Sequence, residues 1–286
     1  MSPLRYHESP PPPDLAWAVQ CFWEAEGPAG GTERIVPDGC PELVVQLGGT
    51  MLAADEGAPP RVQPRALLVG QRSRALRVSP RAPFRTVAAR LRPEALGSLL
   101  RSPAAELTGG WATLEQLFGA EANRLVAQLE DGGQAGQATV EQFLRRRLAA
   151  ARRPVRLERA LAVLRRTRGR LSVRTLREAT GASERWLERA FLREVGLAPR
   201  TFAAVLRVQA ALLLRASEPS WARIAAELEY CDQAHLTREF RSHAGLPPAA
   251  LVQALGPLAR AFVGPRLREL FSVGFVQDPW RDLAAG

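Results

Sequence analysis

The stretch Ile224–Phe240, IAAELEYCDQAHLTREF, decides how the C-terminal half of this chain folds. Its first part has the spacing of an amphipathic helix, with Ile224 and Leu228 on one face. After a short polar break the same spacing returns with Leu236 and Phe240, behind an aspartate suited to cap a new helix. Two short helices joined by so tight a turn predict a helix-turn-helix.

An earlier segment repeats this unit. When Leu187–Pro199 (LERAFLREVGLAP) is set over Leu236–Pro248 (LTREFRSHAGLPP), six of thirteen positions are identical. A repeated helix with repeated exit residues indicates a duplicated unit. Between the two units, Pro199–Ser217 is expected to form the longest helix. At 1.5 Å per residue it would span ~27 Å, comparable with the ~34 Å between successive major-groove faces on one side of a duplex.

The positive charge is concentrated in the same half. The chain has 286 residues and a formal net charge of +10, and all 39 of its basic residues are arginine. Residues 1–151 carry 16 Arg and 16 acids, residues 152–216 carry 16 Arg and 5 acids, and residues 217–286 carry 7 Arg and 8 acids. One basic segment on an otherwise balanced chain indicates a polyanionic partner such as nucleic acid, the alternative being a solvated helical surface.

The first half has mixed α and β patterning. Three segments predict strands, 34–49, 66–71 and 84–91, and helical spacing begins after Pro93. The expected fold is an α+β N-terminal domain, a small barrel-like sheet with helices, followed by an all-α domain of two helix-turn-helix units joined by a long helix. The expected boundaries are 1–137 for the N-terminal sensing or dimerisation domain, 138–153 for a linker helix, 154–252 for the DNA-binding domain and 253–286 for a tail.

Residues 171–251 resemble the DNA-binding domain of the AraC/XylS family. The resemblance is carried by SERWLERAFLREVGLAPRTF, by the long helix ending LRVQAALLLRAS, and by WARIAAELEYCDQAHLTREFRSHAGLPPAAL. It departs from the family pattern at Glu229, which stands where the family usually has a turn glycine. The first half is similar to a domain that often precedes such modules and whose function is not generally established.

The resemblance and the predicted outer faces together define a candidate DNA-contacting set. The family resemblance implies that the protein binds promoter DNA and contacts RNA polymerase. The candidates are Arg185, Glu188, Arg189 and Arg193 in the first unit, and Gln233, Ala234, His235, Thr237, Arg238 and Arg241 in the second.

The first half offers weaker candidates for a ligand site. They are Trp23, Asp38, Cys40 and Glu42, each of which also has an ordinary structural explanation in a turn, strand edge or core. With His7 the only histidine of this half, and with the chain's three cysteines widely spaced, neither a metal site nor a disulfide is expected. No catalytic residue and no cofactor are assigned.

The sequence therefore predicts a cytoplasmic transcription regulator that binds specific DNA sequences. Its N-terminal domain is expected to sense a signal, such as a small-molecule effector, or to mediate homodimerisation. No stretch has the length and hydropathy of a membrane span or a secretory signal. Two alternatives stay open: a DNA-repair or sensor enzyme with Cys40 as nucleophile, and a protein-interaction module with basic helices. Activation or repression is not decided.

Overall fold

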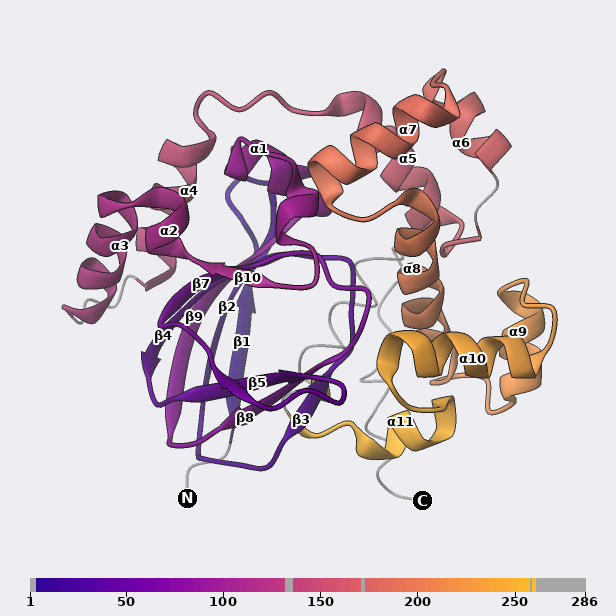
Figure 1. Ribbon diagram of the computed structural model, residues 1–286, viewed down its shortest axis with the longest axis horizontal. Coiled ribbons are helices and arrows are strands. Elements are labelled where there is room, and N and C mark those ends of the chain that lie inside the picture. Colours follow the sequence, from indigo (N-terminus) through magenta and orange to yellow (C-terminus); the bar gives the residue numbers. More distant parts are fainter. Residues whose placement is uncertain (1–3, 132–135, 171–172, 258, 261–286) are drawn as a thin grey trace.

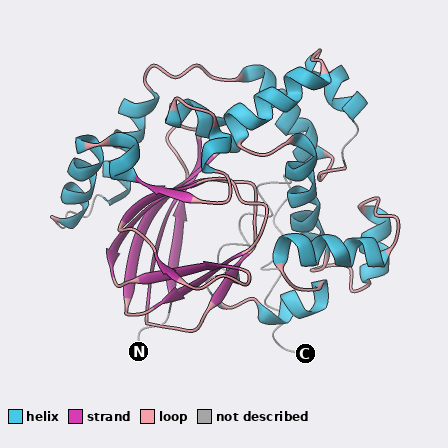
Figure 2. Ribbon diagram, in the orientation of Figure 1, coloured by secondary structure: helices cyan, strands magenta, loops and turns pink. Residues whose placement is uncertain are grey.

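The computed structural model describes residues 4–131, 136–170, 173–257 and 259–260. Two sheets with covering helices form the N-terminal half, and a series of helices forms the C-terminal half (Figures 1 and 2). The expected fold class, an α+β domain followed by an all-α helix-turn-helix domain, is confirmed. Among the described residues the sheets stay open rather than closing into one barrel.

The larger sheet is antiparallel throughout. In the described part of the chain it has six strands, in the order β1-β2-β9-β4-β7-β10. Their bounds are Arg5–Ser9 (β1), Val19–Gly27 (β2), Phe84–Leu91 (β9), Glu42–Gly48 (β4), Ala66–Val69 (β7) and Trp111–Thr113 (β10). Each of the three expected strand segments contributes a strand to this sheet, and the first residues of segment 34–49 belong to β3 of the smaller sheet. The pairing of β4 with the distant β9 rests on contacts far apart in sequence, which a local pattern does not specify.

A smaller antiparallel sheet faces the larger one, in the order β3-β8-β5-β6. Its strands are Glu33–Ile35 (β3), Leu76–Pro80 (β8), Met51–Asp55 (β5) and Arg61–Val62 (β6). Side chains from both sheets form one hydrophobic cluster, to which Trp23 and Val44 contribute from the larger sheet and Met51 and Val78 from the smaller. The facing sheets thus enclose the interior in which the cavity described below lies.

Short helices cover the other face of the larger sheet. They are Leu96–Leu100 (α1), Leu114–Phe118 (α2), Ala120–Glu130 (α3) and Gly136–Leu148 (α4), with 3₁₀ turns at Pro93–Ala95 (η1) and Ala104–Leu107 (η2). Phe143 and Leu144 of α4 are fully buried in the same core as Leu43 and Val87 of the sheet. The helix expected at 138–153 therefore packs as part of the N-terminal core, whereas the expected domain boundaries stay a prediction.

The C-terminal half consists of consecutive helices. They are Val155–Arg166 (α5), Val173–Thr180 (α6), Glu184–Ala190 (α7) with a π-helical continuation Phe191–Val195 (η3), Pro199–Leu214 (α8), Trp221–Glu227 (α9), Gln233–Ala244 (α10) and Pro248–Ala254 (α11). The first helix-turn-helix unit is α6–α7 and the second is α9–α10.

The long helix α8 contributes to the cores of both units. Phe202 and Leu206, near its start, are buried with Leu187 and Phe191 of the first unit. Its second half, for example Leu212, is buried with the core residues of α9 and α10. The helix has 16 residues, so it spans ~24 Å, slightly less than the expected length.

The short helices begin at the polar caps that the sequence predicts. The side chains of Ser183, Ser220 and Asp232 accept hydrogen bonds from backbone N–H groups in the first turns of α7, α9 and α10. A further expected cap, Ser172, lies outside the described residues. Glu229, which replaces the family's turn glycine, adopts a left-handed φ of 58°.

The described helices do not individually meet the requirements of a membrane span, since no single one is long and apolar enough to cross a membrane. One pair of helices, Glu184–Val195 and Pro199–Leu214, has the combined length and apolar composition of a membrane span, but the two are bent by 64° relative to each other.

Candidate DNA-binding surface and interior cavity

The first unit presents its polar face on α7. Arg185, Glu188 and Arg189 are exposed, whereas Leu187 on the opposite face is buried against α5 and α8. Arg193, on the π-helical continuation, is also exposed and lies beside Glu194, with 3.4 Å between Nε and Oε1. The four candidates of this unit therefore lie on one continuous helical segment. Their contact with DNA stays a prediction.

Trp186 has a packing role beside this face. The guanidinium of Arg156 lies 4.6 Å from the centre of its ring, a cation–π arrangement. Arg156 also donates hydrogen bonds to the backbone oxygens of Thr180 and Gly181, in the turn between α6 and α7. The indole thus helps to hold α5 against that turn.

The second unit presents a polar face on α10. Gln233, Ala234, Arg238 and Arg241 are exposed. The two remaining candidates, His235 and Thr237, are half-buried and have partners within the protein. The His235 ring packs edge-on against Tyr230, with 5.2 Å between ring centres, and accepts from the backbone N–H of Cys231 at 3.5 Å. Thr237 Oγ1 donates to the backbone oxygen of Gln233 at 2.9 Å.

A polar brace fixes this unit to α8. The Tyr230 hydroxyl donates to Glu239 Oε2 at 2.7 Å, and Arg207 of α8 forms an ion pair with the same carboxylate. The Arg207 guanidinium lies 4.8 Å from the Tyr230 ring centre. Burial, with the Glu239 charge, raises the pKa of the Tyr230 hydroxyl far above its usual value, so that it stays a hydrogen-bond donor at all physiological pH values.

A cavity of about 120 Å³ lies inside the N-terminal domain, between the facing sheets. Its walls are formed mainly by apolar side chains of β2, β4, β5, β7, β8 and β9. All four ligand candidates, Trp23, Asp38, Cys40 and Glu42, line it. The structure therefore brings these candidates together, although ligand binding itself stays a prediction.

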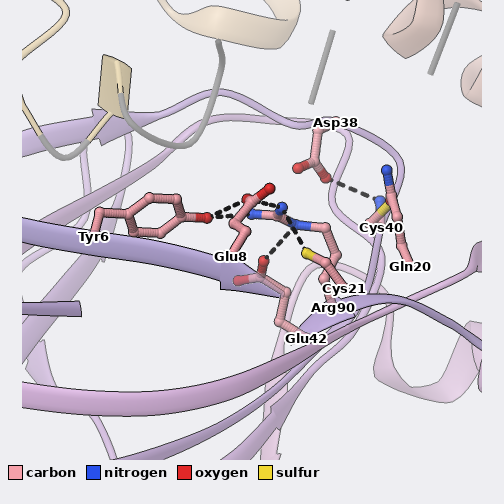
Figure 3. Close-up of polar contacts among 8 residues, drawn as sticks. All are labelled: Tyr6, Glu8, Gln20, Cys21, Asp38, Cys40, Glu42 and Arg90. Carbon is pink, nitrogen blue, oxygen red and sulfur yellow. Dashed lines mark hydrogen bonds and ion pairs between the residues drawn. The ribbon is translucent and has the colours of Figure 1, made fainter. Parts of the chain in front are cut away.

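A buried charge cluster centred on Arg90 (Figure 3) includes Glu42, which lines the cavity. Arg90 is 1% exposed, and its guanidinium donates to Glu8 at 2.6 Å, to Glu42 at 3.1 Å and to the Cys21 sulfur at 3.2 Å. Its Nη2 lies 3.3 Å from the Tyr6 hydroxyl. One arginine thus connects β1, β2, β4 and β9, and it partly offsets the cost of burying two carboxylates.

Burial governs the protonation of the groups at this end. Desolvation raises the pKa of Glu42 above its usual value, although the Arg90 charge opposes the shift. Burial also raises the pKa of the Tyr6 hydroxyl. The pKa of the Cys40 thiol is raised to about 12, again mainly by desolvation. A thiol with so high a pKa is a poor nucleophile, which argues against an enzyme that uses Cys40.

Sequence reasoning missed Arg90. A charged residue inside the apolar strand segment FRTVAARL was the available signal, but its partners Glu8 and Glu42 lie 82 and 48 positions away. No helical or strand period links these positions. No group of three or more His, Cys, Asp or Glu side chains within the described ranges could hold a metal ion.

The segment Val36–Cys40 connects the cavity to the DNA-binding half. Asp38 and Cys40 line the cavity, and the Cys40 N–H donates to Asp38 Oδ1 at 2.9 Å. From the other side, the buried Gln209 of α8 donates to the backbone oxygen of Pro37. Val36 itself belongs to the hydrophobic core of the second unit. No local pattern in the sequence predicts this contact between the halves.

The N-terminal domain also contacts both helix-turn-helix units directly. In the first unit, Gly196 accepts a hydrogen bond from Thr108 Oγ1 at 2.5 Å. In the second, His243 Nδ1 lies 2.6 Å from the Ser73 oxygen, and its backbone oxygen accepts from the Ala75 N–H at 2.7 Å. The relative placement of the two units therefore depends on the N-terminal domain as well as on α8.

Comparison with known families matches two parts of the chain. Residues 176–254 match a family described as a helix-turn-helix domain. Residues 7–111 match a family described as a domain of unknown function, DUF6597. No curated protein matches the chain.

Comparison with solved structures finds broad and distant likenesses. A structure of ToxT from Vibrio cholerae O395, bound to (E)-4-(8-methylnaphthalen-1-yl)but-3-enoic acid, is 11% identical, with 89% of this chain and 100% of that chain covered and a TM-score of 0.45. A 1.65 Å structure of ToxT from Vibrio cholerae is 9% identical, with 89% and 99% covered and a TM-score of 0.45. The AraC-like transcriptional activator CuxR is 10% identical, with 89% and 77% covered and a TM-score of 0.28. Such likenesses say nothing of function or ligand.

Residues 176–254 thus form a helix-turn-helix domain with two units, α6–α7 and α9–α10. This domain supports a DNA-binding transcription regulator, the class of protein that the sequence predicts.

Proposed function

We propose that this regulator binds specific sequences in double-stranded promoter DNA through both helix-turn-helix units. The observation that carries the proposal is the pair of polar helix faces, on α7 and α10, whose units pack against the two ends of the long helix α8. Each face offers an exposed arginine, Arg189 in the first unit and Arg238 in the second. Arginine can donate two hydrogen bonds to guanine in the major groove, which makes both positions suited to base recognition.

Phosphate contacts would supply most of the affinity. Residues 152–216 carry 16 Arg and 5 acids, so the first unit and α8 attract the DNA backbone more strongly than the second unit does. Because such contacts release counterions, affinity falls steeply as the salt concentration rises. We expect the first unit to dominate affinity and the second to add selectivity.

The N-terminal domain would act as the sensor. Its interior cavity is lined by both facing sheets, and the segment Val36–Cys40 lies between that cavity and α8. A bound small molecule that favours one arrangement of this segment would change how the units are presented to DNA. The proposal places the regulator in the cytoplasm, where it would contact RNA polymerase at the promoter. Homodimerisation is a further prediction.

The proposal is tested by selecting binding sites from a pool of random DNA duplexes. The purified chain should recover a preferred site, and Arg189→Ala and Arg238→Ala should each weaken binding to it and relax base preference in one half. Arg5→Ala is the matched control, because Arg5 is an exposed arginine on β1 whose ion-pair partner is Glu26. Uniform weak binding that neither variant alters would contradict sequence-specific recognition.

A further inference from the structure

The cavity of the N-terminal domain lies within one hydrophobic cluster. The side chains that line the cavity and also belong to this cluster come from both sheets: Trp23, Ala25, Val44 and Phe84 from the larger, and Met51, Leu76 and Val78 from the smaller. Such walls offer water few hydrogen bonds, whereas an apolar molecule gains contacts with them as it leaves water. The walls therefore favour an apolar ligand.

The acidic side chains of the lining already interact within the protein. Glu42 accepts a hydrogen bond from Arg90 Nε at 3.1 Å, and Asp38 accepts one from the backbone N–H of Cys40 at 2.9 Å. A cationic ligand would give up its hydration for carboxylates that the protein's own donors already hold. The two carboxylates therefore do not call for a cation.

Other polar side chains of the lining are engaged in the same way. Arg72 forms an ion pair with Asp55, and Gln46 Nε2 donates to Gln63 Oε1 at 3.1 Å. An anionic ligand would therefore compete with Asp55 for Arg72. Thr86 adds a neutral hydroxyl, which suits a single polar group. A ligand that is charged or rich in hydroxyls would lose more hydrogen bonds to water than this lining returns.

The size of the cavity restricts the ligand further. Its volume is about 120 Å³, somewhat below that of an engineered apolar cavity of ~150 Å³ that binds benzene or xenon. A ligand that fits without rearrangement of the walls is therefore no larger than about one six-membered ring or a short aliphatic chain.

Val36 places such a ligand in contact with the DNA-binding half. It lines the cavity, and it is also a buried member of the hydrophobic core of the second helix-turn-helix unit. Because closely packed interiors transmit small displacements of their side chains, a ligand that shifts Val36 would also shift its neighbours in that core. Occupation of the cavity can thus reach the second unit through one side chain.

We propose that the cavity binds a small, uncharged, apolar molecule, such as a single aromatic ring or a short aliphatic chain, and that it selects against charged and hydroxyl-rich molecules. This inference rests on the proposed function, because it names the class of effector that the N-terminal domain senses. Binding in the cavity is nevertheless measured separately from binding to DNA.

The test compares three probes that share one aromatic ring and differ in charge: toluene, benzoate and benzylammonium. Glycerol is added as the hydroxyl-rich probe. Each is titrated into the full chain at neutral pH, and binding is followed by calorimetry and by ¹H–¹³C NMR of the methyl groups of Val44 and Val78, with the exposed Val62 as a reference outside the cavity. Toluene should bind at least about tenfold more tightly than either charged probe, and glycerol should not bind.

A variant that fills the cavity assigns the binding to this site. Val78→Phe places a ring inside the cavity and should abolish the binding of toluene. Val62→Phe is the matched control, because Val62 is exposed on β6 of the same sheet and does not line the cavity, so toluene should bind as before. Circular dichroism checks that both variants are folded, and the comparison of probes on the unaltered chain does not depend on either variant.

The inference is wrong if benzoate or benzylammonium binds as tightly as toluene, if glycerol binds, or if toluene does not bind. The affinity for a selected DNA site, measured with and without toluene, separates this inference from the proposed function. A change of about fivefold or more would support the sensor role as well. Toluene bound in the cavity with unchanged DNA affinity would refute the sensor role and leave the ligand preference standing. A recovered DNA site without toluene binding would refute the ligand preference alone.

Discussion

Gly39 lies at the contact between the cavity segment and α8. Its φ is +78°, and an added Cβ would lie 2.9 Å from the ring of Phe202, which is 1% exposed. Gly39→Ala should therefore lower the free energy of unfolding by about 2–4 kcal/mol, from the left-handed backbone and the overpacked ring together. Denaturant unfolding of the full chain measures this.

Gly57→Ala is the matched control for that prediction. Gly57 has nearly the same φ, +75°, but a Cβ added there would have nothing within 4 Å. Gly57→Ala should therefore lower the free energy of unfolding only by the cost of the left-handed backbone, about 1–2 kcal/mol. Equal losses in the two variants would show that Phe202 does not press on Gly39.

Glu229 offers the opposite case, a non-glycine residue at a position that favours glycine. Its φ is 58°, and its carboxylate is 3.4 Å from Arg170 in an exposed ion pair that contributes little. Glu229→Gly should raise the free energy of unfolding by about 0.5–1 kcal/mol, since glycine adopts this conformation without strain. Thermal and denaturant unfolding both report it.

The control is Glu227→Gly. Glu227 has a comparable exposed ion pair, with Arg168, but it is the last helical residue of α9. Glycine at a helical position should destabilise by up to about 1 kcal/mol. A stability loss in Glu229→Gly as well would mean that the turn tolerates a side chain better than its φ implies.

At the scale of single residues, local chemistry was predictable and buried charge was not. Ser183, Ser220 and Asp232 could be assigned as caps because a cap acts on its own next turn. The turn position of Glu229 followed from the family pattern. The role of Arg90 could not be predicted, because its partners come from three other strands.

At the scale of elements, the Arg90 cluster predicts that the stability of the larger sheet depends on pH. Arg90→Met leaves Glu8 and Glu42 buried without their shared counter-charge, and should cost about 3–5 kcal/mol of unfolding free energy at neutral pH. Desolvation already raises the pKa of Glu42, and loss of Arg90 would raise it further. When folding raises the pKa of a carboxyl group, the linked stability is fully present below the pKa of the unfolded state. That stability is lost as the pH rises through the pKa of the folded state.

The loss of unfolding free energy caused by Arg90→Met should therefore become smaller as the pH is lowered from neutral toward the ordinary pKa range of carboxyl groups. Denaturant unfolding over a pH series, for the variant and the unaltered chain, provides the comparison. Arg5→Met is the control, because the exposed Arg5–Glu26 pair also joins β1 to β2 yet should matter little at any pH. A deficit that does not change with pH would exclude the two carboxylates as its cause.

The predictability of the elements follows the range of their contacts. Both helix-turn-helix units were predicted because their apolar spacing, caps and turns are local, and because one unit repeats the other. Strands were found at three segments, but their order and the second sheet depend on distant pairings such as β4 with β9. For the same reason, the four ligand candidates could be named singly but not placed around one cavity.

At the scale of the whole molecule, Gln209 lies where the cavity and the DNA units can influence each other. Its side chain, 1% exposed, donates to the Pro37 oxygen next to the cavity-lining Asp38. Gln209→Met keeps the length of the side chain but removes the donor. We expect the variant to bind its preferred DNA site about fivefold more weakly than the unaltered chain, because α8 loses its hydrogen bond to the cavity segment.

Fluorescence anisotropy of labelled DNA measures this coupling. The control is Thr108→Val, which removes another hydrogen bond between the halves, to the Gly196 oxygen, away from the cavity segment. It should change the affinity for the same DNA site by less than about twofold. If both variants weaken DNA binding equally, the whole contact surface between the halves, and not Gln209, is responsible.

Val36 has a consequence for attempts to exchange parts of this regulator. It comes from the N-terminal half of the chain but is buried, 3% exposed, in the hydrophobic core of the second helix-turn-helix unit. A hybrid protein that joins residues 154–254 to a foreign sensor would leave a hole in that core. The DNA-binding half of such a regulator should therefore fold stably in a hybrid protein only if the loop around Val36 is transferred with it.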